Sequence, residues 1–388
     1  MTRKYNYNGK IRPRRISRRD FLKLMALTSV LAGCRRLATT TPSATSSPTA
    51  TFAPTATATI APTATSAPSP IATLTSSPSS AVGMGKFVTS RVAFVKTTDR
   101  SAGVRKAIDL LGINPVAGKT VFIKPNFNSS DPAPGSTHPD TLRTLVLKLR
   151  EMEAQEITMG DRSGMGLTQQ VMRELGVFEL AEELGVAVID FDSLVAENWQ
   201  IFMPPGSHWK QGFPFARPCL QAEALVQVCC LKTHQYGGHF TMSLKNSVGM
   251  VAAVVPGGNY SYMEELHTSS HQRAMIAEVN TAYTPALIVL DGIKAFTRGG
   301  PATGDQVSPE VVLAGTDRIA IDAVGVALLR YFGTTVDVTY GPIFQQEQIA
   351  RAVELGLGVD SPHKIELITE DPDSAAYAEQ IRKILVSQ

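Results

Sequence analysis

The chain has 388 residues, of which 43% are hydrophobic and 18% are charged, enough for one large domain or two modest ones. This composition excludes a collagen-like, coiled-coil or wholly disordered protein. Residues 1–36 hold eleven of the 37 Lys and Arg residues and one of the 34 acidic residues, so the remainder of the chain is acidic. Because nucleic-acid binding needs a basic surface, an acidic body argues against a nucleic-acid partner.

The first 34 residues have the layout of an export signal. The pair Arg18-Arg19 stands in a segment, residues 17–23, that resembles a twin-arginine signal, and an apolar run too short to span a bilayer follows it. Residues 31–34 resemble a lipoprotein box that ends at Cys34. We therefore expect the twin-arginine machinery to export the protein and a lipid on Cys34 to anchor it to the outer face of the cell membrane. The alternative is a soluble exported protein from which Cys34 is removed.

Residues 35–87 are rich in Thr, Ser, Ala and Pro, and no charged residue occurs between positions 37 and 85. Such a segment buries too little apolar surface to offset its ordering entropy, so we expect a disordered tether. The sequence thus predicts a signal peptide over residues 1–34, a tether over residues 35–87 and a folded domain over residues 88–388.

The folded part alternates apolar runs with amphipathic segments. Short β-branched runs predict strands at 91–95, 120–124, 156–159, 187–190, 224–231, 286–290, 310–313 and 364–368. Helical periods lie at 101–111, 139–152, 168–175, 178–184, 262–283, 317–331, 342–355 and 374–385. This alternation predicts an α/β fold with a mostly parallel sheet covered by helices on both faces. Residues 198–218, with little periodicity, are expected to form an excursion or lid.

Cysteine usage favours neither a disulfide scaffold nor a metal cluster. Apart from Cys34 the chain has only Cys219, Cys229 and Cys230, and no C-x-x-C motif. We therefore expect no iron–sulfur cluster and no structural zinc site. The apolar run around Cys229 and Cys230 indicates buried thiols, although an exported protein could also pair Cys219 with either of them.

Polar clusters directly follow several predicted strands. In open α/β sheets, ligands bind beyond the carboxyl ends of the strands, so these clusters are candidates for one site. They supply Lys124, Asn126, Asn128, Asp161, Lys232 and His234, and nearby segments add His138, Lys245 and Asn246. The alternative is that each cluster is a turn, a helix cap or a surface ion pair.

Lys124, Lys232 and Lys245 stand among these clusters although the chain after residue 36 is acidic, and this favours an anionic ligand, such as a carboxylate or a phosphate. We expect Lys124 and Lys245 to bind it, together with Asn126, Asn128, Asp161 and Asn246. Lys232, His234 and His138 are the candidates for acid–base chemistry, since neighbouring cations lower one another's pKa. All of these residues except Asn128 are predicted to converge on one pocket at the strand ends.

His267 and His271 are four residues apart in the predicted helix 262–283, so they would share one helix face. This is metal-ligand spacing, although the Glu of a zinc-protease H-E-x-x-H motif is missing. A divalent metal and a phosphate-bearing cofactor are therefore both candidates, and the sequence does not choose between them.

The polar clusters, in this order, resemble a bacterial and archaeal family known as domain of unknown function three-six-two. The motifs that carry the resemblance are Lys124-Pro-Asn-x-Asn128, Thr137-His138-Pro139, Gly160-Asp161-x-Ser163-Gly164, Leu231-Lys232-Thr233-His234, Ser243-Leu244-Lys245-Asn246-x-x-Gly249, Asp291-Gly292, Gly300-Pro301-x-x-Gly304 and Gly315-x-Asp317-x-x-Ala320-x-Asp322. Relatives often carry ferredoxin-like cysteine motifs. This chain has none, so the resemblance implies no electron-transfer role here, and the family name implies no reaction.

The sequence leaves the function open between different classes. The first hypothesis is a lipid-anchored surface protein that binds, and transforms, an anionic small molecule or cofactor with Lys and His as acid–base groups. The alternatives are a non-catalytic surface solute receptor and a metal-cofactor enzyme remotely similar to lactate racemase. A purely structural envelope protein is disfavoured by the clustered polar strand ends.

Overall fold

A ten-stranded mixed sheet forms the centre of the protein in our computed structural model, which describes residues 89–387. The predicted signal peptide, the tether and Cys34 lie outside the described residues. In spatial order the main strands are β12 (Ile365–Ile368), β1 (Ser90–Lys96), β11 (Val311–Gly315), β9 (Pro285–Gly299), β7 (Ala224–His234), β2 (Val121–Lys124), β3 (Ile157–Asp161) and β4 (Ala187–Asp190).

The five consecutive strands β9, β7, β2, β3 and β4 are all parallel to their neighbours. Strand β12 is parallel to β1, whereas β11 runs antiparallel to both β1 and β9. Two short strands, β8 (His239–Thr241) and β10 (Gly304–Val307), fold back antiparallel on β7 and β9. The predicted mostly parallel α/β fold is thus confirmed, and the carboxyl ends of β2, β3 and β7 meet at one edge of the sheet.

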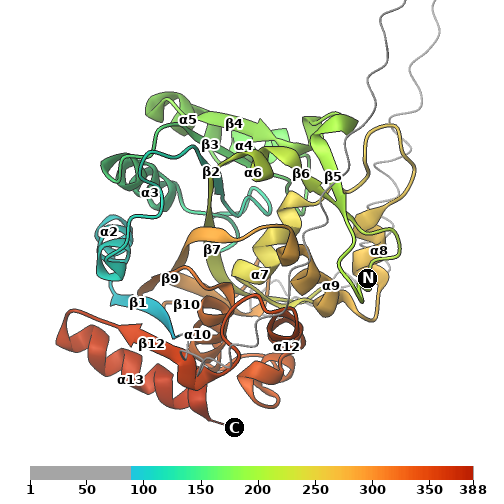
Figure 1. Ribbon diagram of the computed structural model, residues 1–388. Helices are drawn as coiled ribbons and strands as arrows, with labels where there is room; N and C mark the ends of the chain where they lie inside the picture. The colour runs from blue at the N-terminus through green and yellow to red at the C-terminus, as the bar shows by residue number, and fades with distance from the viewer. Residues whose placement is uncertain (1–88, 388) are drawn as a thin grey trace, which may run out of the picture. The chain divides into compact units, whose positions relative to one another are not determined.

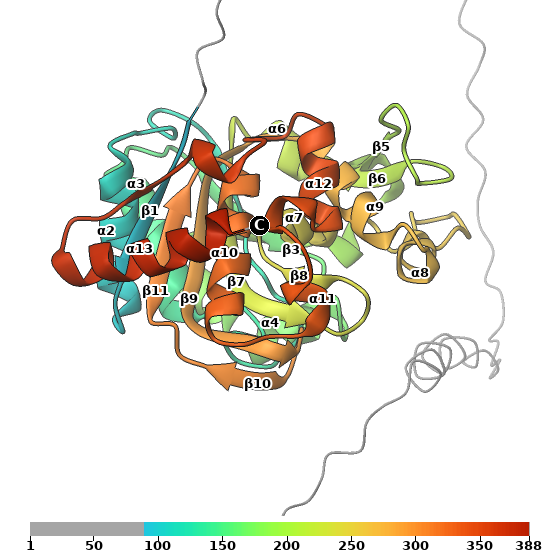
Figure 2. The same cartoon turned by 90° about the horizontal axis from the view of Figure 1, so that it is seen from below.

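Helices cover both faces of the sheet, as the nearly continuous apolar strands require. On β9, Leu287 and Val289 face one core while Ile288 and Leu290 face the other. The first core is covered by α2 (Arg100–Leu111), α3 (Pro139–Glu151), α4 (Thr168–Glu174) and α5 (Val177–Leu184). The second is covered mainly by α10 (Arg318–Tyr331), α12 (Glu347–Glu354) and α13 (Pro372–Val386). Figure 1 shows α2 and α3 at the left and α13 along the bottom, and Figure 2 shows α13 beside α10.

The predicted excursion at 198–218 is an ordered part of the fold. It contains the antiparallel hairpin of β5 (Trp199–Phe202) and β6 (Phe213–Ala216), followed by α6 (Arg217–Gln221). Its aromatic side chains, among them Trp209 and Phe215, form a third core with α8 (Tyr262–Thr268) and α9 (Gln272–Val279). Large buried aromatic side chains make this segment a fixed wall of the molecule.

The prediction of one helix over 262–283 is wrong. Helix α8 ends at Thr268, and α9 begins at Gln272. Between them Ser269 has an extended backbone and its hydroxyl accepts a hydrogen bond from the His271 amide at 3.0 Å. Serine side chains compete with the helix for backbone groups in this way, which explains why an unbroken apolar period did not give an unbroken helix.

The remaining elements are short: α7 (Ser243–Asn246) and α11 (Val336–Thr339) were not predicted. Cys219, Cys229 and Cys230 are buried free thiols, so neither of the possible disulfides is formed. Within residues 89–387, no helix combines the length and the apolarity needed to cross a bilayer.

Candidate functional site

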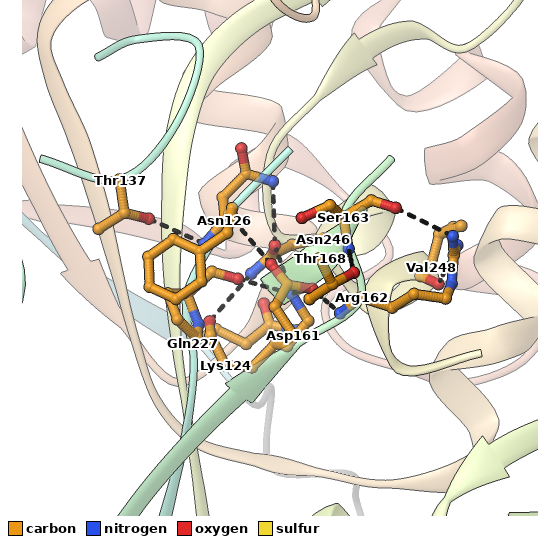
Figure 3. A network of polar contacts seen from close by, with 12 residues as sticks. Lys124, Asn126, Thr137, Asp161, Arg162, Ser163, Thr168, Gln227, Asn246 and Val248 are labelled. Atoms are coloured by element: carbon orange, nitrogen blue, oxygen red, sulfur yellow. Dashed lines mark hydrogen bonds and ion pairs between the residues drawn. The ribbon is translucent and has the colours of Figure 1, made fainter. Parts of the chain in front are cut away.

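A buried ion pair lies where the neighbouring parallel strands β2 and β3 end. The Lys124 ammonium is 2.7 Å from the Asp161 carboxylate, and the two residues are 1% and 2% exposed. The same carboxylate accepts backbone hydrogen bonds from Phe127 at 2.7 Å and Arg162 at 2.8 Å. Burial raises the pKa of Asp161, while Lys124 and the two amides oppose that rise. Asp161 is therefore fully occupied by protein partners (Figure 3).

Two asparagines connect Lys124 to the second buried lysine. The Asn246 side-chain oxygen accepts hydrogen bonds from Lys124 at 3.3 Å and from the Asn126 amide at 3.2 Å. The Asn126 oxygen in turn accepts from Lys232 at 2.8 Å, and Lys232 also donates to the Gly135 carbonyl. Lys232 thus sits fully buried at the end of β7 with neutral partners only. The side-chain amides of Asn246 and Asn126 thus link the ammonium groups of Lys124 and Lys232, in the place where a second carboxylate would neutralise them.

Lys245, on α7, differs from the other two lysines. Among residues 89–387 its ammonium makes no ion pair and no hydrogen bond, and it lines a small cavity of about 50 Å³. Two further polar atoms without partners belong to residues that line this cavity, the side-chain nitrogen of Asn128 and the hydroxyl of Thr241. The remaining lining residues are Lys124, Asn126, Asp161, Arg162, Gly164, Asn246, Val248 and Gly249.

Arg162, which is half-buried, adds a fourth cation. Its guanidinium donates to the backbone carbonyls of Val251 at 2.8 Å and Ser163 at 3.1 Å, and it forms no ion pair with any described carboxylate. Burial lowers the pKa of Arg162. Carbonyl groups orient a guanidinium but do not neutralise it, so its charge remains available to a ligand.

The crowding of cations shifts the lysine pKa values toward neutrality. Burial, helped by repulsion from Lys232 and Arg162, lowers the pKa of Lys245 to about 7. Burial also lowers the pKa of Lys232 to about 8. Both lysines therefore exchange protons in a range where an ordinary lysine stays charged.

His234 lies close to Lys245 across a glycine turn. A Cβ atom on Gly238 would be 2.8 Å from the Lys245 Cε and 2.9 Å from the His234 Nδ1, so both side chains border the same point. The buried Nδ1 of His234 has no hydrogen-bond partner. Burial and the cations nearby, Lys245 foremost, hold the pKa of His234 well below its usual range, so its imidazole is neutral at pH 7.

Glycines let the backbone approach this cluster closely. A Cβ on Gly249 would lie 2.8 Å from the Lys124 ammonium, and it would also collide with the Asp161 carboxylate. A Cβ on Gly164 would meet the Asn128 side-chain oxygen at 2.7 Å. The cavity exists because these two positions carry no side chain.

A buried carboxylate on α10 holds the segment that carries Lys245 and Asn246. Asp322 is fully buried and accepts hydrogen bonds from the amides of Ser243 at 2.7 Å and Leu244 at 3.0 Å. Burial raises the pKa of Asp322 to about 7. Asn280 fixes the other side of the segment by donating to the Leu244 carbonyl at 3.0 Å. Asp322 therefore holds α7 in place from the side away from the cavity, since it does not line the cavity itself.

The structure does not bring His138 into the cavity. Its side chain caps α3 by accepting a hydrogen bond from the Asp140 amide at 3.2 Å, and it is partly exposed. Burial and the nearby Arg100 lower its pKa. Asp291, from the same set of motifs, pairs with Arg100 at 2.9 Å and accepts from Thr141 at 2.7 Å. Both residues have local structural partners away from the lysines.

His267 and His271 do not share a helix face, because the chain breaks between α8 and α9. The His267 Nδ1 lies 2.6 Å from the Met263 carbonyl oxygen, while the His271 ring stacks on His208 with centroids 4.3 Å apart. In the described part of the chain no three His, Cys, Asp or Glu residues are grouped to hold a metal ion. The helical spacing that suggested a metal pair is therefore lost.

Arg162 and Thr241 were missed by sequence reasoning. Arg162 stands inside the Gly160–Gly164 cluster, but an exposed arginine is the common case and nothing in the sequence marks this one as half-buried beside a cavity. Thr241 belongs to β8, a three-residue strand too short to show a period.

A larger surface hollow of about 410 Å³ lies beside α2, lined by charged residues such as Lys106 and Glu370 that pair with each other. Those charges are satisfied, which leaves the lysine cavity as the candidate site.

Comparison with known proteins gives a family and two distant likenesses. The family described as "Domain of unknown function (DUF362)" matches residues 121–327. The thylakoid-associated protein sll1697 of Synechocystis is 25% identical over 223 residues, 56% of this chain and 65% of that protein, so the chain spans less than two thirds of this relative.

The lactate racemase apoprotein of Thermoanaerobacterium thermosaccharolyticum has a similar solved structure, with a TM-score of 0.37 and 16% identity over 59% of this chain and 54% of that chain. A likeness at this level carries no argument about chemistry. The metal-cofactor alternative therefore stays a prediction from the sequence.

Proposed function

This chain belongs to the DUF362 family, and we propose that its cavity binds a small anionic molecule and uses Lys245 and His234 as acid–base groups. One observation carries the proposal: the Lys245 ammonium lines a polar cavity without any partner among the described residues. Lys245 is half-buried, and a cation partly removed from water without a counter-charge is costly, so an anionic ligand is the partner that lowers the cost.

The acid–base role follows from the protonation states. A general acid or base works best when its pKa lies near the working pH, and the pKa of Lys245 is lowered to about 7. His234 stays neutral and its Nδ1 has no hydrogen-bond partner, so this nitrogen can accept a proton. It lies beside Gly238, as the Lys245 side chain does. An anion bound at Lys245 stabilises the ammonium form, so its binding draws a proton to the site.

Calorimetry on the purified full-length protein tests this function. We expect acetate, malonate or inorganic phosphate to bind the wild type with uptake of a proton near pH 8, seen as a dependence of the heat on the buffer. Lys245→Met should weaken that binding at least tenfold, whereas Lys383→Met, an exposed lysine on α13, should not. Absence of binding by all three anions, or equal binding by the two variants, contradicts the proposal. Binding without turnover of any candidate substrate would favour the solute-receptor alternative.

We further propose that the protein is exported and lipid-anchored through Cys34, since the twin-arginine pair and the lipoprotein box stand in the required order. Metabolic labelling with a fatty-acid analogue should mark the wild type and not Cys34→Ala. Lys replacements at Arg18 and Arg19 should retain the precursor inside the cell. Labelling of both proteins, or of neither, contradicts the anchor.

A further inference from the structure

The charge around the lysine cavity exceeds what one negative ligand charge balances. The cations are Lys124, Arg162 and Lys245 on the cavity wall and Lys232 one hydrogen bond behind it, and the wall contains the single carboxylate of Asp161. That carboxylate is already paired with Lys124. Even when the two lysines with lowered pKa values are each only partly protonated, more than one positive charge is left without a partner.

The acids nearest to these cations do not remove the excess. Asp131 and Asp192 act on Lys232 and Arg162 only through space, and neither forms an ion pair with them. Asp131 accepts from the Ser129 hydroxyl at 2.8 Å. Asp192 accepts from the Thr168 hydroxyl at 2.6 Å. The counter-charge therefore has to come from a ligand that carries about two negative charges.

Three hydrogen-bond donors without protein partners could bind such a ligand, and they come from three parts of the fold. They are the Lys245 ammonium on α7, the Asn128 amide after β2 and the Thr241 hydroxyl on β8, and all three residues line the same cavity. A carboxylate offers two oxygens in one plane. A phosphate group offers three strong acceptor oxygens and a charge between −1.5 and −2 near pH 7. The number of donors matches the phosphate group better.

The size and the lining of the cavity limit what else can enter. Its volume of about 50 Å³ exceeds the space that one water molecule needs, but it is small compared with the several hundred Å³ of an ordinary ligand pocket. Val248 is the one apolar side chain in the lining. The cavity therefore suits a compact, fully polar head group and not an aliphatic or aromatic body.

We propose that the cavity binds a phosphate-type dianion, either inorganic phosphate or the phosphate head group of a larger molecule, through Lys245, Asn128 and Thr241. This inference rests on the proposed anion-binding function and makes it specific. Lys124 and Asp161 form the floor, where their mutual pairing keeps the lysine fixed beneath the ligand. Arg162 contributes charge from the wall without being displaced from its carbonyl partners.

The experiment is a titration of the full-length protein with four probes at pH 7: inorganic phosphate, glycerol phosphate, malonate and acetate. We expect phosphate to bind at least tenfold more tightly than acetate and several-fold more tightly than malonate. Glycerol phosphate should bind at least as tightly as inorganic phosphate if the natural ligand is an ester, and more weakly if it is the free ion. Either of these last two results supports the proposal.

Two isosteric variants test the contacts. Asn128→Asp exchanges a donor for a negative charge and should weaken phosphate binding at least tenfold, and Thr241→Val removes one hydroxyl and should weaken it several-fold. Circular dichroism and the melting temperature of each variant show whether it is folded. If Asn128→Asp does not fold, Thr241→Val and the ranking of the four probes still decide.

The outcomes separate this inference from the proposed function. If acetate binds as tightly as phosphate and both are lost in Lys245→Met, the anion site stands and the phosphate assignment is wrong. If malonate binds as tightly as phosphate, the site selects a doubly charged anion but not the phosphate group, and the phosphate assignment is wrong. If phosphate binds equally to wild type, Lys245→Met and Thr241→Val, it binds elsewhere and the inference fails. If no probe binds the wild type, both proposals fail.

Discussion

The fully buried carboxylate of Glu278 on α9 and the half-buried ammonium of Lys245 on α7 are two charges shielded from water, and they differ in whether the protein supplies a partner. Glu278 is fully buried and accepts hydrogen bonds from the Ser207 hydroxyl and the His208 amide, both at 2.9 Å. It also pairs with Arg351 at 3.1 Å and with the His208 ring at 2.6 Å. Lys245 has no comparable partner among residues 89–387.

The difference separates a structural cluster from a ligand site. The partners of Glu278 come from the 198–218 segment and from α12, so its carboxylate is neutralised by the protein and links these elements to α9. The lysine cavity is left with unpartnered donors and excess positive charge. A fold keeps such an imbalance where a ligand completes it, because strained or uncompensated groups gather at functional sites.

The largest expected effect is on the closed cluster. Glu278→Gln leaves Arg351 and His208 without their buried counter-charge, and we expect a loss of about 3 kcal/mol in unfolding free energy, measured by urea denaturation. The control is Glu354→Gln, which removes only an exposed partner of Arg351 and should cost less than about 1 kcal/mol. Phosphate binding should survive in both. Equal losses in the two variants, or a loss of binding, would contradict the separation of the clusters.

A methyl group at Gly249 should damage the lysine site directly. Because its Cβ would press on Lys124 and Asp161, Gly249→Ala should cost about 2 kcal/mol and weaken anion binding at least tenfold. Gly333→Ala is the matched control, since Gly333 has a positive φ of 76° and no atom within 4 Å of the added carbon. It should cost about 1 kcal/mol through backbone strain alone and leave binding intact. Unchanged binding in Gly249→Ala would count against the geometry of the site.

Asp322 tests whether the segment behind the cavity positions the ligand residues. Asp322→Asn keeps one acceptor for the two amides of α7 and sets a donor against the other, so we expect a loss of about 1–2 kcal/mol. Anion affinity should fall several-fold although Asp322 is not part of the cavity wall. Asp317→Asn, at the start of α10, is the control: it caps the helix and should lower stability without changing affinity. A loss of affinity in both variants would point to general loosening.

The smallest effect has the opposite sign. The pKa of Lys245 is about 7 in the folded protein and near 10.5 when the chain unfolds, so between these values the unfolded chain holds a proton that the folded one has lost. Stability of the wild type therefore rises with pH across this window. Lys245→Met removes the penalty of the half-buried charge and should be more stable than wild type by about 1 kcal/mol at pH 6.5, after allowance for solvent around the side chain.

That advantage should shrink toward pH 10, because both proteins are then uncharged at this position. Urea denaturation at pH 6.5 and pH 9.5 measures it. Lys383→Met, an exposed lysine, should show no such pH dependence relative to wild type. A Lys245→Met variant that is less stable than wild type at both pH values would show that the lysine is satisfied by the protein, as Glu278 is.

Local chemistry explains why the strands and helices could be predicted. Runs that are apolar on both faces, such as Val311–Gly315, mark strands of a sheet covered on both sides. Asp99 and Asp317 each accept a backbone amide at the start of a helix, a signal that is written in neighbouring residues. Both signals depend on a few adjacent positions, so they survive whatever the rest of the chain does.

The candidate site could be foreseen in part for the same reason. Polar residues after parallel strands come to one edge, and this brings Lys124 beside Asp161 as expected. Lys245 and Asn246 also arrive there, although α7 itself was not predicted. His138 did not, because its ring accepts the local amide of Asp140 and caps a helix. A loop histidine reads the same in sequence whether it turns toward a cavity or toward its own backbone.

The sequence by itself determined the alternation of strands and helices, the parallel order that gathers polar strand ends, and the presence of three lysines among them. The tertiary structure alone decided which lysine is left unpaired. Lys124 finds its carboxylate on the next strand and its amide 122 residues away, Lys232 finds an amide 106 residues away, and Lys245 finds neither. Sequence patterns report short-range periods and caps, whereas the balance of buried charge is set by contacts between distant segments.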